Sequence, residues 1–166
     1  MSTRLRAFVA SFAIVSCIAA ASAQDLSLST PAGQTVTLSS LRGNIVVMLF
    51  SGAQDPQRRE GLKALVSLAE RFQGKNVKIL WVSVNTPSEA TNDQLKSIAG
   101  GAPSVSVLRD NNQAAFKRFS GKVAQLPTIV VLDRQGNPFG QPRGGFNPNS
   151  DFINDLSSIV NGLLER

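Results

Sequence analysis

Residues 121–136 read GKVAQLPTIVVLDRQG. Within this stretch, Pro127 stands directly before a run of apolar, mostly β-branched residues at 128–132, and an acidic residue and a glycine follow the run. A continuous apolar run of this length, bounded by turn residues, is typical of a strand buried on both faces of a sheet. The stretch therefore predicts a buried strand over 128–132 and a hairpin turn over 133–137.

Similar apolar runs alternate with segments of helical periodicity along the rest of the chain. Further strands are predicted at 26–30, 35–38, 45–50, 77–84, 104–109 and 139–146. Helices are predicted over 62–72, 86–100, 111–119 and 151–164, the second of them opening at a capping box formed by Thr86 and Glu89. This alternation indicates an α/β fold with a central sheet, and the first two strands form an N-terminal hairpin.

The N-terminal residues have the features of a secretory signal peptide. Two arginines precede an apolar stretch at 7–21, which leads into an Ala-Ser-Ala sequence. We expect cleavage after Ala23, which leaves residues 24–166 as a single domain in the periplasm or outside the cell. The alternative is a lipoprotein, because the residues around Cys17 also resemble a bacterial lipobox, in which case the chain is anchored to the membrane through that cysteine.

The residue types present exclude several classes of chemistry. Cys17 is the only cysteine, and the chain has neither histidine nor tyrosine. After cleavage of residues 1–23, disulfides, thiolate nucleophiles, imidazole bases and the usual zinc or haem ligands are all missing. The formal net charge is +6, and it falls to +4 without the two N-terminal arginines. The basic residues are scattered, and no aromatic stacking pattern accompanies them, so nucleic acid is not an expected partner.

Two segments together give a family resemblance. Residues 41–50 (LRGNIVVMLF) and the opening stretch 121–136 match the two halves of a pattern found in TlpA/ResA and redoxin (AhpC/TSA-like) proteins, which are exported thioredoxin-like proteins. The resemblance covers nearly all of residues 24–166. It implies a thioredoxin-like fold, in which a central mixed sheet carries helices on both faces and is extended by an N-terminal β-hairpin.

The same alignment shows that the family's chemical centre is missing. Asp55 and Arg58 stand at the two positions of the C-x-x-C motif, and Gln54 replaces the tryptophan that precedes it. A carboxylate does not form and break S–S bonds, so thiol–disulfide exchange is not expected. Asp55, followed by Pro56, is predicted to cap the next helix; the alternative is a functional carboxylate, as general base or ligand anchor.

Two neighbouring features remain as candidate binding elements. The resemblance implies that Pro127 is cis and that Leu126 offers its backbone to an extended peptide, a mode of binding that needs no cysteine. The alternative is that Pro127 only shapes the turn before the strand. Arg59 and Lys63 share one helix face, which is either a solvated surface or a cationic rim that attracts an acidic partner.

We therefore expect a redox-inactive accessory module of the cell envelope. Its candidate partner-binding residues are Gln54, Asp55, Arg59, Leu126 and Pro127, and its expected partner is a protein or an extended peptide segment. No metal, cofactor or catalytic residue is expected, and the membrane is a partner only through lipidation. The alternative is an enzyme of the thiol–disulfide or antioxidant type that works without the C-x-x-C motif.

Overall fold

The computed structural model describes residues 25–121, 125–145 and 150–166. The predicted signal peptide and Cys17 lie outside these residues. The strands are β1 Ser27–Ser29, β2 Thr35–Thr37, β3 Ile45–Ser51, β4 Val77–Ser83, β5 Ser106–Arg109, β6 Thr128–Leu132 and β7 Arg143–Gly144. The helices are α1 Arg58–Arg71, α2 Asn92–Gly100, α3 Ala114–Ser120 and α4 Ser150–Leu164, with a 3-10 turn, η1, at Ser39–Leu41.

The strands form one mixed sheet in the order β2-β1-β5-β4-β3-β6-β7. The three central strands β3, β4 and β5 are parallel, whereas β6 is antiparallel to β3 with Phe50 opposite Thr128. Every residue of β3 and β6 is buried, as their continuous apolar runs predict. β1 and β2 pair antiparallel, which confirms the N-terminal hairpin.

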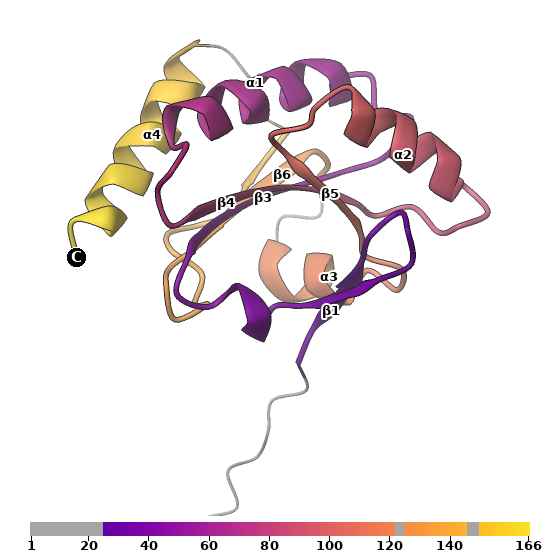
Figure 1. Cartoon of the computed structure of the whole chain (residues 1–166), viewed down its shortest axis with the longest axis horizontal. Coiled ribbons are helices and arrows are strands. Elements are labelled where there is room, and N and C mark those ends of the chain that lie inside the picture. Colours follow the sequence, from indigo (N-terminus) through magenta and orange to yellow (C-terminus); the bar gives the residue numbers. More distant parts are fainter. Residues whose placement is uncertain (1–24, 122–124, 146–149) are drawn as a thin grey trace, which may run out of the picture.

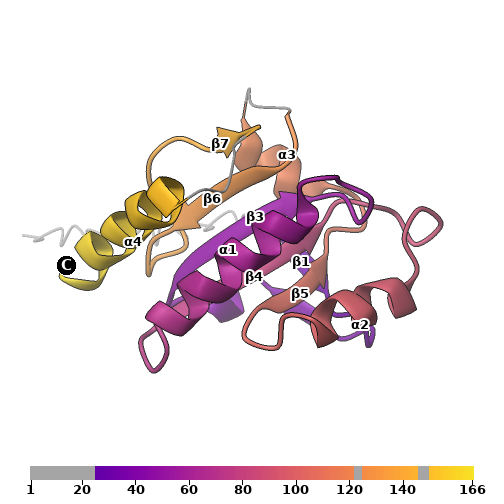
Figure 2. The same ribbon diagram turned by 90° about the horizontal axis from the view of Figure 1, so that it is seen from above.

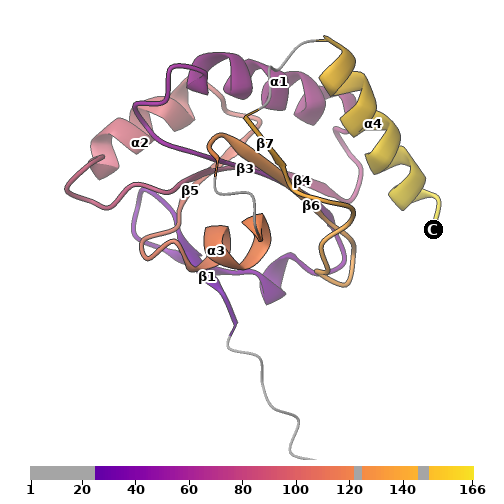
Figure 3. The same cartoon turned by 180° about the vertical axis from the view of Figure 1, so that it is seen from behind.

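Helices cover both faces of this sheet. Figure 1 shows α1, α2 and α4 on one face and α3 on the other, and Figure 3 shows the same layers from behind. The alternate residues of β3 therefore enter two separate apolar clusters: Val47 and Leu49 pack with α1, α2 and α4, whereas Val46 and Met48 pack with α3 and the hairpin. Seen from above, α1 lies across β3 and β4 (Figure 2).

The start of α2 differs from the prediction. Thr86 and Glu89 form only a turn, in which the Thr86 N–H donates to the Glu89 carboxylate at 2.8 Å. The helix begins at Asn92, and its capping box is made by Thr91 and Gln94. Both quartets have the capping-box spacing, but the backbone continues as a helix only after the second one, where Leu95 enters the core.

Across residues 25–121, 125–145 and 150–166, no helix is long and apolar enough to span a bilayer. The helices are instead amphipathic, with their apolar sides on the sheet.

Candidate functional site

The candidate site lies where the three parallel strands end at one edge of the sheet. The loop after β3, residues 52–57, lies beside the segment after β4 and the end of β5. Polar groups follow all three strands, and the carboxyl ends of parallel strands are a common place for ligands in α/β sheets. Asp55, at the family's first cysteine position, lies in this loop, and Arg58, at the second, directly follows it.

Asp55 is half-buried, and hydrogen bonds inside the loop hold its carboxylate. Oδ2 accepts from the Ser51 hydroxyl at 3.0 Å, and Oδ1 accepts from the Gln57 N–H at 2.8 Å. The prediction that Asp55 caps the helix is wrong in its position: α1 begins at Arg58, and its N-cap residue is Gln57, which makes no side-chain cap bond. Asp55 caps the turn before the helix, because an Asp side chain readily bonds the N–H two residues on.

Arg58, at the second cysteine position, bonds back to the loop. One of its guanidinium nitrogens, Nη1, donates to the backbone carbonyl of Ala53. Its own N–H donates to the Asp55 carbonyl at 3.0 Å. Asp55 and Arg58 therefore act together as structural groups that close the loop, and neither supplies a thiol for redox chemistry.

Arg109, a buried arginine that the sequence pattern did not indicate, connects the segment after β4 to this loop. The Arg109 side chain is only 2% exposed, and it donates to the carbonyls of Asn85 and Ala90 at 3.0 and 2.6 Å and to the Asn92 side chain at 3.1 Å. Burial lowers the pKa of Arg109. The Asn85 side chain in turn accepts from the Ala53 N–H at 2.6 Å.

Sequence reasoning missed Arg109 because it ends an otherwise apolar strand. A terminal arginine ordinarily turns into solvent, so its position alone indicates no internal role. The sequence offered one signal of this role. The backbone carbonyls of the polar segment after β4 need hydrogen-bond donors once that segment folds over the sheet, and a nearby arginine can supply them.

Asp110 follows Arg109 and is fully buried. Its Oδ2 accepts from the Phe116 N–H at 2.8 Å, which supports the first turn of α3, and its Oδ1 has no hydrogen-bond partner among the described residues. The carboxylate lies toward α3, on the opposite face of the sheet from α1, so its position assigns it to the attachment of α3.

The Leu126–Pro127 peptide bond is cis, as the resemblance implied. Pro127 is buried, and its carbonyl accepts from the Gly145 N–H at 2.9 Å. The Leu126 side chain packs against the core cluster on the α3 side. Within the described residues, neither the N–H nor the carbonyl of Leu126 forms a hydrogen bond.

The sheet register brings this peptide bond close to the candidate loop. Because Phe50 pairs with Thr128, the next positions along the two antiparallel strands place Pro127 and Leu126 beside Ser51 and the start of the loop. Gln54, at the tip of the loop, is exposed. The structure thus gathers four of the candidate residues, Gln54, Asp55, Leu126 and Pro127, at one end of the sheet.

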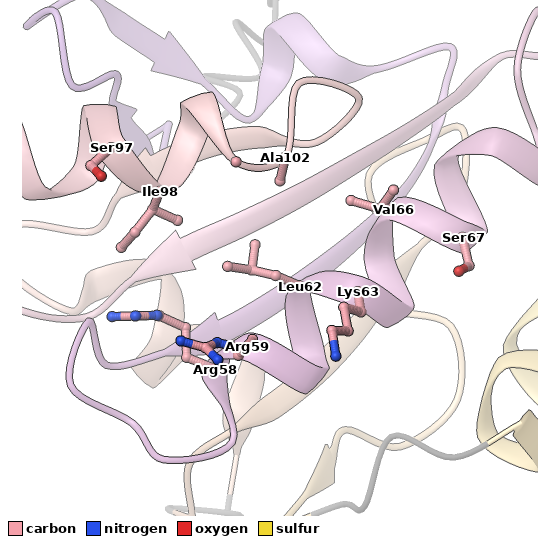
Figure 4. A pocket seen from close by; sticks show the side chains of 10 residues that line it. Arg58, Arg59, Leu62, Lys63, Val66, Ser67, Ser97, Ile98 and Ala102 are labelled. Carbon is pink, nitrogen blue, oxygen red and sulfur yellow. The ribbon is translucent and has the colours of Figure 1, made fainter.

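Arg59 points to a different surface. It lines a groove of about 730 Å³ between α1 and α2, together with Arg58 and Lys63 (Figure 4). The groove begins at the end of α1 that adjoins the candidate loop and continues along the helix. In the strand order it lies on the side of β4 and β5, whereas Leu126 adjoins β6, on the other side of β3. The expected shared face of Arg59 and Lys63 is confirmed as one wall of this groove.

Solved structures with the same fold are numerous. A thioredoxin-like protein from Aeropyrum pernix matches with a TM-score of 0.66 and 18% identity, over 83% of this chain and 89% of that one. A secreted disulfide oxidoreductase from Mycobacterium tuberculosis, homologous to E. coli DsbE, matches with a TM-score of 0.62 and 18% identity, over 84% and 96%. An exposed lipoprotein thioredoxin from Streptococcus pneumoniae matches with a TM-score of 0.64 and 21% identity, over 81% and 98%.

Comparison of the sequence itself gives the family. A search among curated proteins finds no match. The model of the AhpC/TSA family matches residues 19–137, which include β1 to β6 and the whole candidate loop. The thioredoxin-like fold and the two sequence segments that surround the missing C-x-x-C motif agree with this match. The chain therefore belongs to the AhpC/TSA family, as a thioredoxin-like member of the redoxin type without cysteines at the motif's two positions.

Proposed function

We propose that this protein is a redox-inactive, exported member of its family that binds an extended peptide segment of a partner protein. The proposed contact surface is formed by Gln54, Leu126 and Pro127, with Asp55 and Arg59 at its margin. The observation that carries the proposal is the backbone of Leu126, whose N–H and carbonyl have no hydrogen-bond partner among the described residues.

An extended peptide is the ligand that suits such a backbone. A free N–H and carbonyl at a strand edge pair with another main chain, and the side chains beside them provide selectivity. Leu126 lies two residues before β6, which is buried and paired on both sides, so the backbone edge at this end of the strand is held rigidly. A rigid edge favours binding, because little conformational freedom is lost when the peptide pairs with it.

The neighbouring loop supports a binding role over a catalytic one. Asp55 bonds to Ser51 and Gln57, and Arg58 bonds to the Ala53 carbonyl, so both groups at the cysteine positions are already engaged. Gln54 remains exposed at the loop tip and offers both donors and acceptors to a peptide.

Export is the second part of the proposal. The features that support it are the N-terminal signal-peptide pattern and the secreted and lipoprotein neighbours among the solved structures. Mass spectrometry of the protein isolated from its native cells tests it: a chain that begins at Gln24 supports cleavage after Ala23. A lipidated Cys17 at the N-terminus would identify the anchored form instead, and an intact N-terminus would contradict export.

Site-specific cross-linking tests the binding proposal. A photoreactive amino acid placed at Gln54 or Leu126 is expected to form a specific product with a partner in intact cells, whereas the same amino acid at Lys117 on α3 is not. A second variant, Leu126→Pro, removes the backbone N–H that the proposal requires and is expected to reduce cross-linking from position 54. Equal products at 54, 126 and 117 would contradict a defined site.

Enzyme assays test the alternative that the chain catalyses its family's reaction. The mature protein is expected to show no disulfide reduction and no peroxide consumption above a protein-free control, because it has no thiol. The double variant Asp55→Cys with Arg58→Cys is expected to gain disulfide reductase activity, since the loop, α1 and the cis-proline are in place. Turnover by the unmodified protein would refute the redox-inactive assignment.

A further inference from the structure

The groove between α1 and α2 is amphipathic. Its α1 wall carries three cationic side chains, Arg58, Arg59 and Lys63, and its apolar surface comes from both helices, including Leu62 and Ile98. These two side chains point toward each other across the groove in Figure 4. Both are only half-buried, although they pack on the core cluster beneath them. The folded chain therefore leaves apolar surface uncovered beside a row of positive charge.

The three cations differ in how far they are already neutralised. Lys63 pairs with Glu60 at 3.1 Å on the helix surface, and one nitrogen of Arg58 bonds to the Ala53 carbonyl. The guanidinium of Arg59 forms no hydrogen bond or ion pair with any described residue. Among the residues that the structure describes, none that lines the groove is acidic. Arg59 is thus the side chain best able to take an anionic group.

We propose that this groove binds a small organic anion with an apolar body, for which a medium-chain alkyl carboxylate is the simplest model. The carboxylate pairs with Arg59, whose planar fork suits two oxygens, and the alkyl chain lies against Leu62, Val66 and Ile98. The groove meets the proposed peptide-binding surface only at Arg59, on its margin, and anion binding does not require that a peptide binds.

The dimensions favour a small molecule over a protein helix. The volume of about 730 Å³ is within the range of small-molecule pockets, roughly 300–1,000 Å³. A docking helix needs a continuous apolar groove that accepts several anchors over two or more turns. Here the apolar surface is short and lies between Ser97 on α2 and Ser67 on α1 (Figure 4), so it matches a single short chain.

Titration calorimetry with octanoate and decanoate, below their micelle concentrations, tests the proposal on the mature protein. Each methylene that becomes buried contributes about 0.8 kcal/mol, so decanoate is expected to bind more tightly than octanoate, by up to about fifteenfold. Decanol, which has the same chain without the charge, is expected to bind at least about tenfold more weakly than decanoate.

Three variants locate the site. Arg59→Gln removes the proposed anion partner and is expected to weaken decanoate binding by about tenfold. Ile98→Asn makes the apolar wall polar and is expected to reduce the advantage of decanoate over octanoate. Lys117→Gln removes one positive charge from α3, on the opposite face of the sheet, and is expected to leave binding unchanged.

The melting temperature of each variant shows whether the fold is intact, since all three substituted side chains are at least partly exposed. Saturable binding that depends on both charge and chain length, and that falls in Arg59→Gln but not in Lys117→Gln, supports the proposal. Absence of binding, equal affinity for decanol, or an equal loss in Lys117→Gln would overturn it.

Discussion

Replacement of Arg109 by methionine tests whether the buried guanidinium organises the loops at the candidate site. Arg109→Met keeps an unbranched apolar stem and removes every donor. In the folded protein these donors bind the carbonyls of Asn85 and Ala90 and the side chain of Asn92. Arg109 forms no ion pair with a described carboxylate, so the substitution leaves no acid without its partner.

The expected loss of stability follows from the burial of the acceptors. Ala90 is fully buried and Asn85 is half-buried, and an acceptor left unpaired there costs about 1–3 kcal/mol. Asn92 is exposed, so water replaces its lost bond. The variant also avoids the cost of burying a charge, which offsets part of the loss. The net expectation is a destabilisation of about 2–4 kcal/mol, or roughly 6–12 °C in Tm for a chain of this size.

Urea unfolding followed by tryptophan fluorescence measures this change, because Trp81 is the only tryptophan and is fully buried. Hydrogen exchange at the Ala53 N–H measures whether the loop after β3 also opens more easily in the variant. Asn85 accepts that hydrogen bond and is itself held by Arg109, so exchange at Ala53 is expected to be faster in the variant.

Two matched variants complete the test. Arg109→Lys keeps the charge but loses the planar fork, so it is expected to be intermediate in stability. Arg118→Met, at an exposed position of α3, is expected to stay within about 0.5 kcal/mol of the wild type. If Arg109→Met were as stable as Arg118→Met and Ala53 exchanged at the wild-type rate, the guanidinium would not be what holds these loops.

Two further predictions concern helix packing and acid stability. Gly61→Ala is expected to destabilise the protein by about 1–3 kcal/mol in urea unfolding, because a Cβ there would lie 2.9 Å from Leu49 Cδ2. A Cβ at Gly162 would meet nothing within 4 Å, so Gly162→Ala is expected to stabilise α4 by up to about 1 kcal/mol. The backbone N–H and hydroxyl of Thr86 hold the pKa of Glu89 below its usual 4.5. This contact therefore stabilises the fold above pH 4.5 and is lost as the pH falls through the lower folded value, so wild type and Glu89→Gln are expected to converge in stability in acid; a constant difference would contradict this.

The sequence by itself determined the sheet and its layers. The apolar runs over 45–50 and 128–132 leave no polar face to the solvent, so they had to form central strands, and the structure places β3 and β6 there. The missing cysteines and the position of Asp55 and Arg58 at the redox motif were also readable from the residues alone, because they depend only on identity and spacing.

Only the tertiary structure decided what the polar residues do. Asp55 caps the turn before α1, and Thr91 in place of Thr86 opens α2, because helix starts depend on backbone direction as well as on local spacing. Arg109 points inward because carbonyls from a segment 17 to 24 residues earlier in the chain surround it there. Likewise, the groove beside Arg59 exists only because α1 and α2 lie side by side on the sheet, and no local pattern specifies that contact.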